Sequence, residues 1–226
     1  MTDLPAPVER YLARALPPAT EIPSRVRVGQ EGEMRLKPGG RWLRFTAVEE
    51  FSVREIAFSW RARFSLASLV PLRVVDGYAA GAGRLDARLF GLVPVVRARG
   101  PAVSEGEVYR YLAELPWAPH AILANRSLSW SDLDARTVEV VTRVGSASPA
   151  VRLAFDEADD VVRSWAERRP RAERRTVRQY PWRGAFHDHA TLAGIRVPTR
   201  AEVTWELPDG PFSYWRGTIT SLELYE

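Results

Sequence analysis

The chain of 226 residues contains no cysteine, and Lys37 is the single lysine among its 32 basic residues. The absence of cysteine excludes disulfide bonds, thiolate metal sites and cysteine nucleophiles. No run of about 18 apolar residues occurs, which excludes a membrane-spanning helix. The segment from Met1 to Pro7 lacks the basic start and the apolar stretch of a secretory signal, so we expect a cytoplasmic protein.

Catalytic fingerprints are missing as well. The sequence has no G-x-G-x-x-G motif, no P-loop, no H-E-x-x-H and no G-x-S-x-G. Nucleotide-dependent and serine-hydrolase chemistry therefore lack support, and we expect neither a metal nor a cofactor. The net charge is +4, and the aromatic residues alternate in strand-like patterns instead of standing among the basic runs. We therefore expect no nucleic-acid partner.

The length and composition indicate a globular protein with a full core. Hydrophobic residues make up 46% of the chain and charged residues 27%. All-β domains commonly reach this size as one unit, so we expect residues 1–226 to form a single domain.

Three segments between Phe45 and Tyr78 place a large apolar residue at every second position. The residues that share a face in each are Phe45, Ala47, Glu49 and Phe51; Phe58, Trp60, Ala62 and Phe64; and Leu72, Val74, Asp76 and Tyr78. Because side chains alternate across a strand, Glu49 and Asp76 point where the aromatic residues point. A carboxylate on a buried face is costly unless it is paired or lines a wet cavity. The pattern therefore predicts a sheet with a partly polar concave face.

Two segments show helical spacing. The first runs from Val8 to Leu16 and is stopped by the two prolines that follow. In the second, Ser104 and Glu107 match a capping box ahead of an apolar stripe that extends to Leu115. Most of the remaining chain alternates with period two. We therefore predict a mainly β (α+β) fold, a curved antiparallel sheet or half-barrel of about nine to eleven strands with an N-terminal helix and a mid-chain covering helix.

Several short strings resemble those of an uncharacterised bacterial family of unknown function. They are Phe45–Glu49 (F-T-A-x-E), Phe58–Arg63 (F-x-W-x-A-R), Asp76–Tyr78, Glu114–Pro119 (E-L-P-W-x-P) and Gly194–Pro198. The order of elements is also similar to that of lipoprotein-carrier half-barrels. This resemblance implies an unclosed antiparallel sheet that wraps a hydrophobic cavity beneath helices, and it implies no established chemistry.

The candidate site residues are inward carboxylates, aromatics and arginines. Glu49, Asp76 and Glu114 are the candidate catalytic groups if the protein is an enzyme, with Arg63 or Arg110 as their partners; the alternative is a structural ion pair that ties helix to sheet. The predicted ligand-binding residues are Trp60, Arg63, Tyr78, Arg110, Trp117 and Trp182. We expect Trp117, between two prolines, to sit in a stiff loop at the mouth of the cavity.

These features favour a cytoplasmic protein that binds a small hydrophobic or lipid-like ligand between the curved sheet and the helix from Val108 to Leu115. The alternative is a cofactor-independent enzyme, an isomerase, cyclase or hydrolase, in which a buried carboxylate of the same cavity moves a proton.

Overall fold

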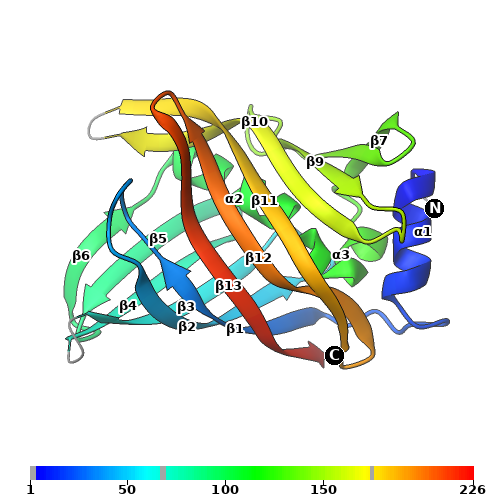
Figure 1. The fold of residues 1–226 in the computed structure, drawn as a ribbon, viewed down its shortest axis with the longest axis horizontal. Helices are drawn as coiled ribbons and strands as arrows, with labels where there is room; N and C mark the ends of the chain where they lie inside the picture. Colours follow the sequence, from blue (N-terminus) through cyan, green and yellow to red (C-terminus); the bar gives the residue numbers. More distant parts are fainter. Residues whose placement is uncertain (1–3, 67–69, 174–175) are drawn as a thin grey trace.

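The computed structural model describes residues 4–66, 70–173 and 176–226. Thirteen strands in these residues form one antiparallel sheet in the order β6-β5-β4-β3-β2-β1-β13-β12-β11-β10-β9-β8-β7 (Figure 1). Their bounds are β1 Arg25–Met34, β2 Leu43–Ser52, β3 Phe58–Leu66, β4 Val70–Ala79, β5 Ala82–Leu89, β6 Val93–Ala98, β7 Ser129–Asp134, β8 Thr137–Val141, β9 Ala150–Phe155, β10 Val161–Glu173, β11 Thr176–Leu192, β12 Ile195–Leu207 and β13 Gly210–Tyr225.

The curved antiparallel half-barrel expected from the sequence is confirmed, but the expected number of strands is too low. Strand β7 shows why. Its sequence is Ser-Trp-Ser-Asp-Leu-Asp, and nearly all of its side chains are exposed. A strand with solvent on both faces has no alternation of apolar and polar residues, so its sequence carries no period-two signal.

The helices are α1 (Ala6–Ala15), α2 (Pro101–Ala113), the 3₁₀ helix η1 (Leu115–Trp117) and α3 (Pro119–Ala124). The N-terminal helix and the mid-chain helix lie where the sequence predicts them. The capping box is wrong, because α2 begins at Pro101 after Gly100 and Ser104 lies inside the helix. The hydroxyl of Ser104 instead accepts a hydrogen bond of 2.9 Å from the backbone N–H of Gly83 on β5. None of the helices in the described part of the chain is long and apolar enough to cross a membrane.

Helix α2 lies inside the curve of the sheet (Figure 1). It joins the two limbs of the sheet, by which we mean strands β1–β6 on one side and strands β7–β13 on the other. It packs against β5 on one limb and against β9 and β10 on the other. Its side chains Val108, Tyr111 and Leu112 are fully buried. By packing against both limbs, the helix fixes the distance between them.

One end of the half-barrel is formed by the turns that join β1 to β2, β5 to β6 and β12 to β13, on the left and upper left of Figure 1; we call it the hairpin end. Helix α1 lies at the opposite end. Because α2 and α3 fill the concave face toward α1, the concave face at the hairpin end is the part that helices leave open.

The close approach of β5 to α2 generates a stability prediction. A Cβ atom at Gly83 would lie 2.7 Å from the Cα atom of Ser104, whereas a Cβ atom at Gly106 within α2 would come no nearer than 3.8 Å to its neighbour. We expect Gly83→Ala to lower the free energy of unfolding by roughly 1–3 kcal/mol through overpacking. Gly106→Ala should instead raise it by up to about 1 kcal/mol, because glycine is a poor helix former.

Denaturant unfolding of both variants checks this prediction. Equal effects of the two substitutions would mean that α2 does not sit against β5 as closely as described.

Candidate functional site

Three neighbouring strands bring the candidate carboxylates into one row on the concave face. Glu49 on β2 pairs in register with Trp60 on β3, and Trp60 pairs with Asp76 on β4. The two carboxylates therefore flank one indole ring. This placement follows from the alternation seen in the sequence, since all three residues occupy inward positions of their strands.

Arg110 on α2 reaches down to this row and joins it to the helix. Its guanidinium donates to Glu49 Oε1 at 2.7 Å, to Asp76 Oδ2 at 2.9 Å and to Glu114 Oε1, one helical turn away, at 2.9 Å. The same guanidinium lies over the rings of Phe58 and Trp60, with its Cζ 5.0 and 5.2 Å from their centroids. One cation thus meets three carboxylates and two aromatic faces.

A second layer of hydrogen bonds closes the cluster behind Glu49. The Gln30 side chain donates from Nε2 to Glu49 Oε2 at 2.8 Å, and the indole N–H of Trp60 donates to Gln30 Oε1 at 2.8 Å. Both oxygens of Glu49 are therefore occupied, and its side chain is completely buried. Gln30 was not among the residues expected from sequence, because a lone glutamine on a strand carries no signal of an inward orientation.

Burial dominates the electrostatics of the cluster. It raises the pKa of Glu49 well above the ordinary value of a glutamate, because desolvation outweighs the attraction to Arg110. Burial acts to lower the pKa of Arg110, but the charges of Glu114, Glu49 and Asp76 outweigh it and raise this pKa well above its ordinary value. Arg110 is therefore a permanent cation at the centre of the site.

The structure adds two residues that sequence reasoning missed, Glu107 and Arg169. Arg169 on β10 is buried, donates to the backbone oxygen of Gly106 from Nε and Nη2, and places its guanidinium 4.3 Å from the ring centroid of Trp182. Glu107 lies one turn before Arg110 on α2 and is 8% exposed. The spacing of Glu107, Arg110 and Glu114, which fits one helix face, is a signal for Glu107, although Glu107 also fits a capping box. No such signal marks Arg169.

Three carboxylate oxygens of the cluster have no hydrogen-bond partner among the described residues: Asp76 Oδ1, Glu107 Oε2 and Glu114 Oε2. Burial raises the pKa of Glu107 well above its ordinary value, and the nearby charge of Asp76 adds to this effect. An unpaired buried acceptor costs roughly 1–3 kcal/mol. The cluster therefore has an excess of acceptors over donors.

Asp76, Glu107, Arg110, Glu114 and Arg169 form the inner wall of a cavity of about 570 Å³ beneath the open concave face. Its aromatic lining residues are Trp60, Phe64, Trp182, Trp205, Phe212, Tyr214 and Trp215, and its polar ones are Arg35, Asp76, Glu107, Arg110, Glu114, Arg169 and Arg171. The remaining lining residues are aliphatic and include Leu85 and Ala87 on β5 and Val203 on β12. The cavity is thus apolar along its walls and polar where α2 meets the sheet.

The structure places the predicted site residues in three groups. Trp60, Asp76, Arg110, Glu114 and Trp182 line the cavity. Glu49 lies behind the wall, sealed by its hydrogen bonds.

The third group lies away from the cavity. Arg63 is exposed on the convex face, because the alternation that turns Phe64 inward turns Arg63 outward. Tyr78 is buried near the far end of β4, opposite Phe58. The structure therefore removes Arg63 and Tyr78 from the candidate site.

Trp117 is a core residue and not part of a loop at the cavity mouth. It belongs to η1, is 2% exposed, and donates its indole N–H to the backbone oxygen of Pro198 at 3.0 Å. Its ring meets Phe186 edge-on, with centroids 5.8 Å apart. The flanking prolines start a 3₁₀ turn and a short helix that fold beneath α2, instead of stiffening an exposed loop.

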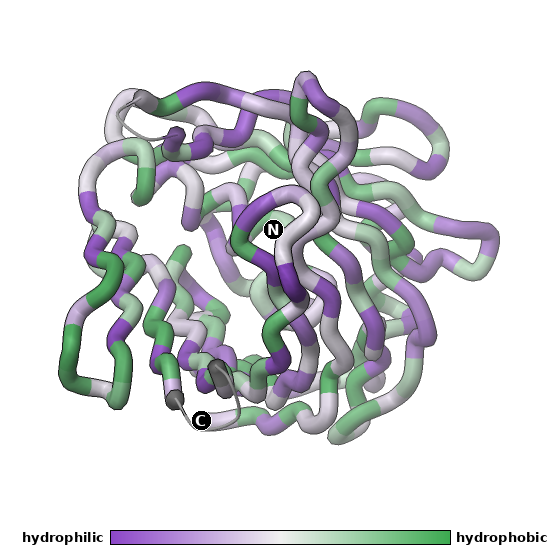
Figure 2. The backbone as a smooth tube through the Cα atoms, turned by 60° about the vertical axis from the view of Figure 1, so that its left-hand side comes forward, coloured by the Kyte–Doolittle hydropathy of each residue, from purple (hydrophilic) through white to green (hydrophobic). Residues whose placement is uncertain are grey.

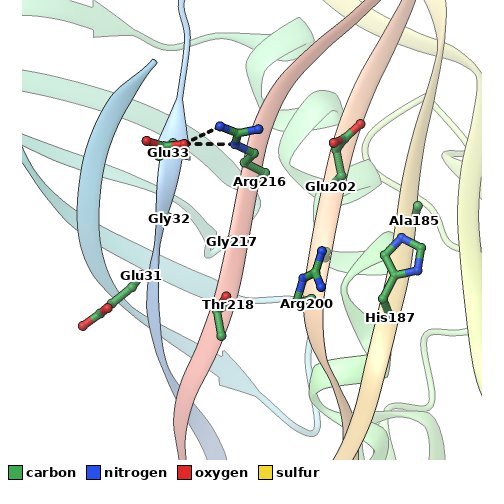
Figure 3. Close-up of a pocket in the computed structure, with 11 residues that line it drawn as sticks. Glu31, Gly32, Glu33, Ala185, His187, Arg200, Glu202, Arg216, Gly217 and Thr218 are labelled. Atoms are coloured by element: carbon green, nitrogen blue, oxygen red, sulfur yellow. Dashed lines mark hydrogen bonds and ion pairs between the residues drawn. The ribbon is translucent and has the colours of Figure 1, made fainter.

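A second hollow lies on the convex face of the sheet, over β1, β13, β12 and β11 (Figure 3). Its lining is charged and polar, and Arg216 binds Glu33 through two hydrogen bonds of 3.0 and 2.6 Å. Outward side chains of four adjacent strands form it, in cross-strand rows such as Glu33, Arg216 and Glu202. The hollow is a salt-bridged outer surface, and it offers no apolar walls to a ligand.

Comparison with known protein families decides the classification. The family model described as Family of unknown function (DUF6544) matches residues 1–217. The chain belongs to this family. A comparison with curated proteins gives no match.

Solved structures with a similar arrangement include a LolA superfamily protein from Nitrosomonas europaea (TM-score 0.49, 12% identity, 98% of this chain and 93% of that chain covered). A putative outer membrane lipoprotein-sorting protein domain from Vibrio parahaemolyticus has TM-score 0.49 and 9% identity, with coverage of 89% and 85%. A DUF1329 family protein from Desulfovibrio piger has TM-score 0.49 and 10% identity, with coverage of 99% and 94%. The function of the DUF6544 chain has to follow from its own residues.

The electrostatics of Glu107 generate a pH prediction. Its pKa is raised in the folded state, so the folded protein holds a proton that the unfolded chain releases above the ordinary glutamate pKa of 4.5. Stability contributed by this group is therefore lost as the pH rises from about 4.5 toward the raised pKa. We expect Glu107→Gln to raise the free energy of unfolding at pH 8 by roughly 1–3 kcal/mol and to flatten its decline with pH.

Urea unfolding between pH 5 and pH 8 measures this effect. The matched control is Glu157→Gln, whose side chain is 95% exposed and which should leave the pH profile unchanged. A Glu107→Gln protein that keeps the full wild-type decline would contradict the prediction.

Proposed function

We propose that the protein binds a small amphiphilic ligand whose hydrocarbon part lies along the aromatic walls of the cavity. The observation that carries this proposal is the cavity itself. Its volume of about 570 Å³ falls within the range of roughly 300–1,000 Å³ that is typical of small-molecule sites. Apolar walls with a few convergent polar groups are the usual design of such sites.

The polar wall supports a ligand that carries hydrogen-bond donors. Asp76, Glu107 and Glu114 border the cavity and each has an oxygen without a partner among the described residues. Arg110, the cation that contacts this cluster of carboxylates, is already shared by three of them. An amine or hydroxyl group at this wall satisfies acceptors that are otherwise unpaired, whereas a carboxylate adds another acceptor.

The alternative of a cofactor-independent enzyme has less support from the geometry. Glu49, the most deeply buried of the predicted catalytic carboxylates, lies behind the cavity wall with both oxygens occupied. Asp76 and Glu114 border the cavity but are held by Arg110, as expected for an ion-paired cluster that ties helix to sheet. The cytoplasmic location stays a prediction from the sequence.

Blocking the cavity tests the binding proposal. Ala87 lines the cavity and is buried, so Ala87→Phe places a ring where the ligand lies; Ala82→Phe on the same strand adds the ring at an exposed position. We expect Ala87→Phe to weaken binding of the neutral probe N-phenyl-1-naphthylamine at least about tenfold. A tenfold loss corresponds to the free energy gained by burying roughly two methylene groups.

The measurement is probe emission excited through the tryptophans that line the cavity, with thermal unfolding recorded to verify the fold. Ala87→Leu, a smaller change, should give an intermediate loss. Equal binding of the probe by wild type, Ala87→Phe and Ala82→Phe would contradict the proposal. Native mass spectrometry of the purified protein, followed by organic extraction, identifies any ligand that co-purifies.

The donor preference is tested with ligands of equal chain length. We expect dodecylamine and dodecanol to displace the probe more strongly than dodecanoate does, by about tenfold, the value of one or two additional hydrogen bonds. Glu107→Gln should reduce the preference for the amine over the alcohol. A preference for dodecanoate would instead assign Arg110 as an anion receptor.

A further inference from the structure

Exposed apolar side chains gather at the hairpin end. Leu36 in the β1–β2 connection is 73% exposed, and Phe90 and Leu92 in the β5–β6 turn are 57% and 80% exposed. On the other limb, Val177 at the start of β11 is also exposed. Figure 2, in which the left-hand side of Figure 1 comes forward, shows the hydrophobic colour running along the β5–β6 hairpin. Single exposed apolar residues are ordinary, but a contiguous group marks an interaction site.

Edge strand β6 continues this apolar group. Val93, Val95 and Val96 are all exposed, and β6 pairs with β5 on one side only among the described residues. Leu36, Val95 and Val96 also line the cavity. The exposed group is therefore the outer continuation of the cavity wall.

Basic side chains surround these apolar tips. Lys37 and Arg41 are exposed in the β1–β2 connection, Arg88 is exposed on β5, and the exposed Arg73 lies beside Gly91 in the β5–β6 turn. Within residues 4–66, 70–173 and 176–226, these four cations make no ion pair, as the salt bridges of that part of the chain involve other residues.

The acidic residues of the same end are fewer and mostly engaged. Glu173 pairs with Arg171 and Arg178, Glu206 pairs with Arg183, and Asp209 lies in the β12–β13 turn. The hairpin end therefore carries a surplus of positive charge around protruding apolar side chains. This combination is complementary to an anionic lipid surface, whose phosphates meet the cations while apolar tips enter the acyl boundary.

We propose that the hairpin end docks on an anionic lipid bilayer, with Leu36, Phe90 and Leu92 inserted at the interface and Lys37, Arg41, Arg73 and Arg88 at the headgroup level. Docking in this orientation places the cavity opening directly against lipid. A ligand then passes between the cavity and the bilayer without crossing water. The inference goes beyond the proposed ligand binding, because all the surface residues that it places at the bilayer, except Leu36, lie outside the cavity lining.

Vesicle flotation of the full chain tests the proposal. We expect binding to vesicles of phosphatidylcholine mixed with phosphatidylglycerol, weaker binding to phosphatidylcholine alone, and a decline with added salt. The double variant Lys37→Glu, Arg41→Glu should weaken binding at least about 25-fold. Each basic side chain near an anionic surface strengthens binding about fivefold, and the variant removes two of them. The double variant Phe90→Ser, Leu92→Ser should weaken it at least about tenfold.

Matched controls come from other exposed positions. Leu133→Ser changes a leucine on β7 that is 47% exposed, and Arg54→Glu changes an exposed arginine in the β2–β3 connection; both should bind vesicles as wild type does. Equal binding to neutral and anionic vesicles, or equal losses in the controls, overturns the proposal. Absence of vesicle binding also overturns it and assigns the apolar tips to a protein partner.

The blocked variant Ala87→Phe separates this inference from the proposed function. It should keep wild-type vesicle binding, because its substitution lies within the cavity. Normal vesicle binding with no probe binding in the wild-type protein would reject the ligand proposal alone. Probe binding without vesicle binding would reject the docking proposal alone.

Discussion

The shared guanidinium of Arg110 is the constraint on which the arrangement of the molecule depends. It connects α2 to β2 and β4 through charged hydrogen bonds in an interior where loss of one ionic partner costs roughly 3–5 kcal/mol. The helix therefore cannot slide along the sheet without leaving Glu49 buried and unpaired. This position decides which face of α2 borders the cavity, and it keeps the helix away from the hairpin end. The opening of the half-barrel is thus a consequence of a buried ion-pair cluster.

Arg169 holds the helix from the opposite limb by a different kind of contact. It binds a backbone oxygen of α2 and stacks on Trp182 and Trp205, so its charge is balanced by a carbonyl dipole and two aromatic faces. Between them, the two arginines span the curve of the sheet and set its width at α2. The aromatic side chains that line the cavity project from β3 on one side and from the adjacent strands β11, β12 and β13 on the other, and they border the cavity without filling it.

Much of this arrangement could be predicted from the sequence. Alternation alone placed Glu49, Trp60 and Asp76 on the inward faces of their strands, and helical spacing placed Arg110 on a covering helix. The errors have physical causes. Glu107 satisfied a local capping pattern, yet the helix began one turn earlier at Pro101 because Gly100 and Pro101 suit a helix start. Trp117 was assigned to a loop because short 3₁₀ and α segments have no usable period. The role of Arg169 could not be predicted, since a sequence does not reveal that a guanidinium will be covered by indoles contributed by later strands.

The pairing of β1 with β13 at the centre of the sheet has a consequence for how the protein forms. Strands β1 to β6 and β7 to β13 are each meanders whose partners are neighbours in sequence, whereas the central seam joins Arg25 to Tyr225 and Met34 to Trp215. Long sequence separation slows a contact, because the loop must close before the pairing stabilises it. During synthesis the first meander emerges with β1 as an unpaired edge, and β7 to β12 are made before its partner β13 arrives. Strand β13 thus completes the curved sheet after all the other strands have been made.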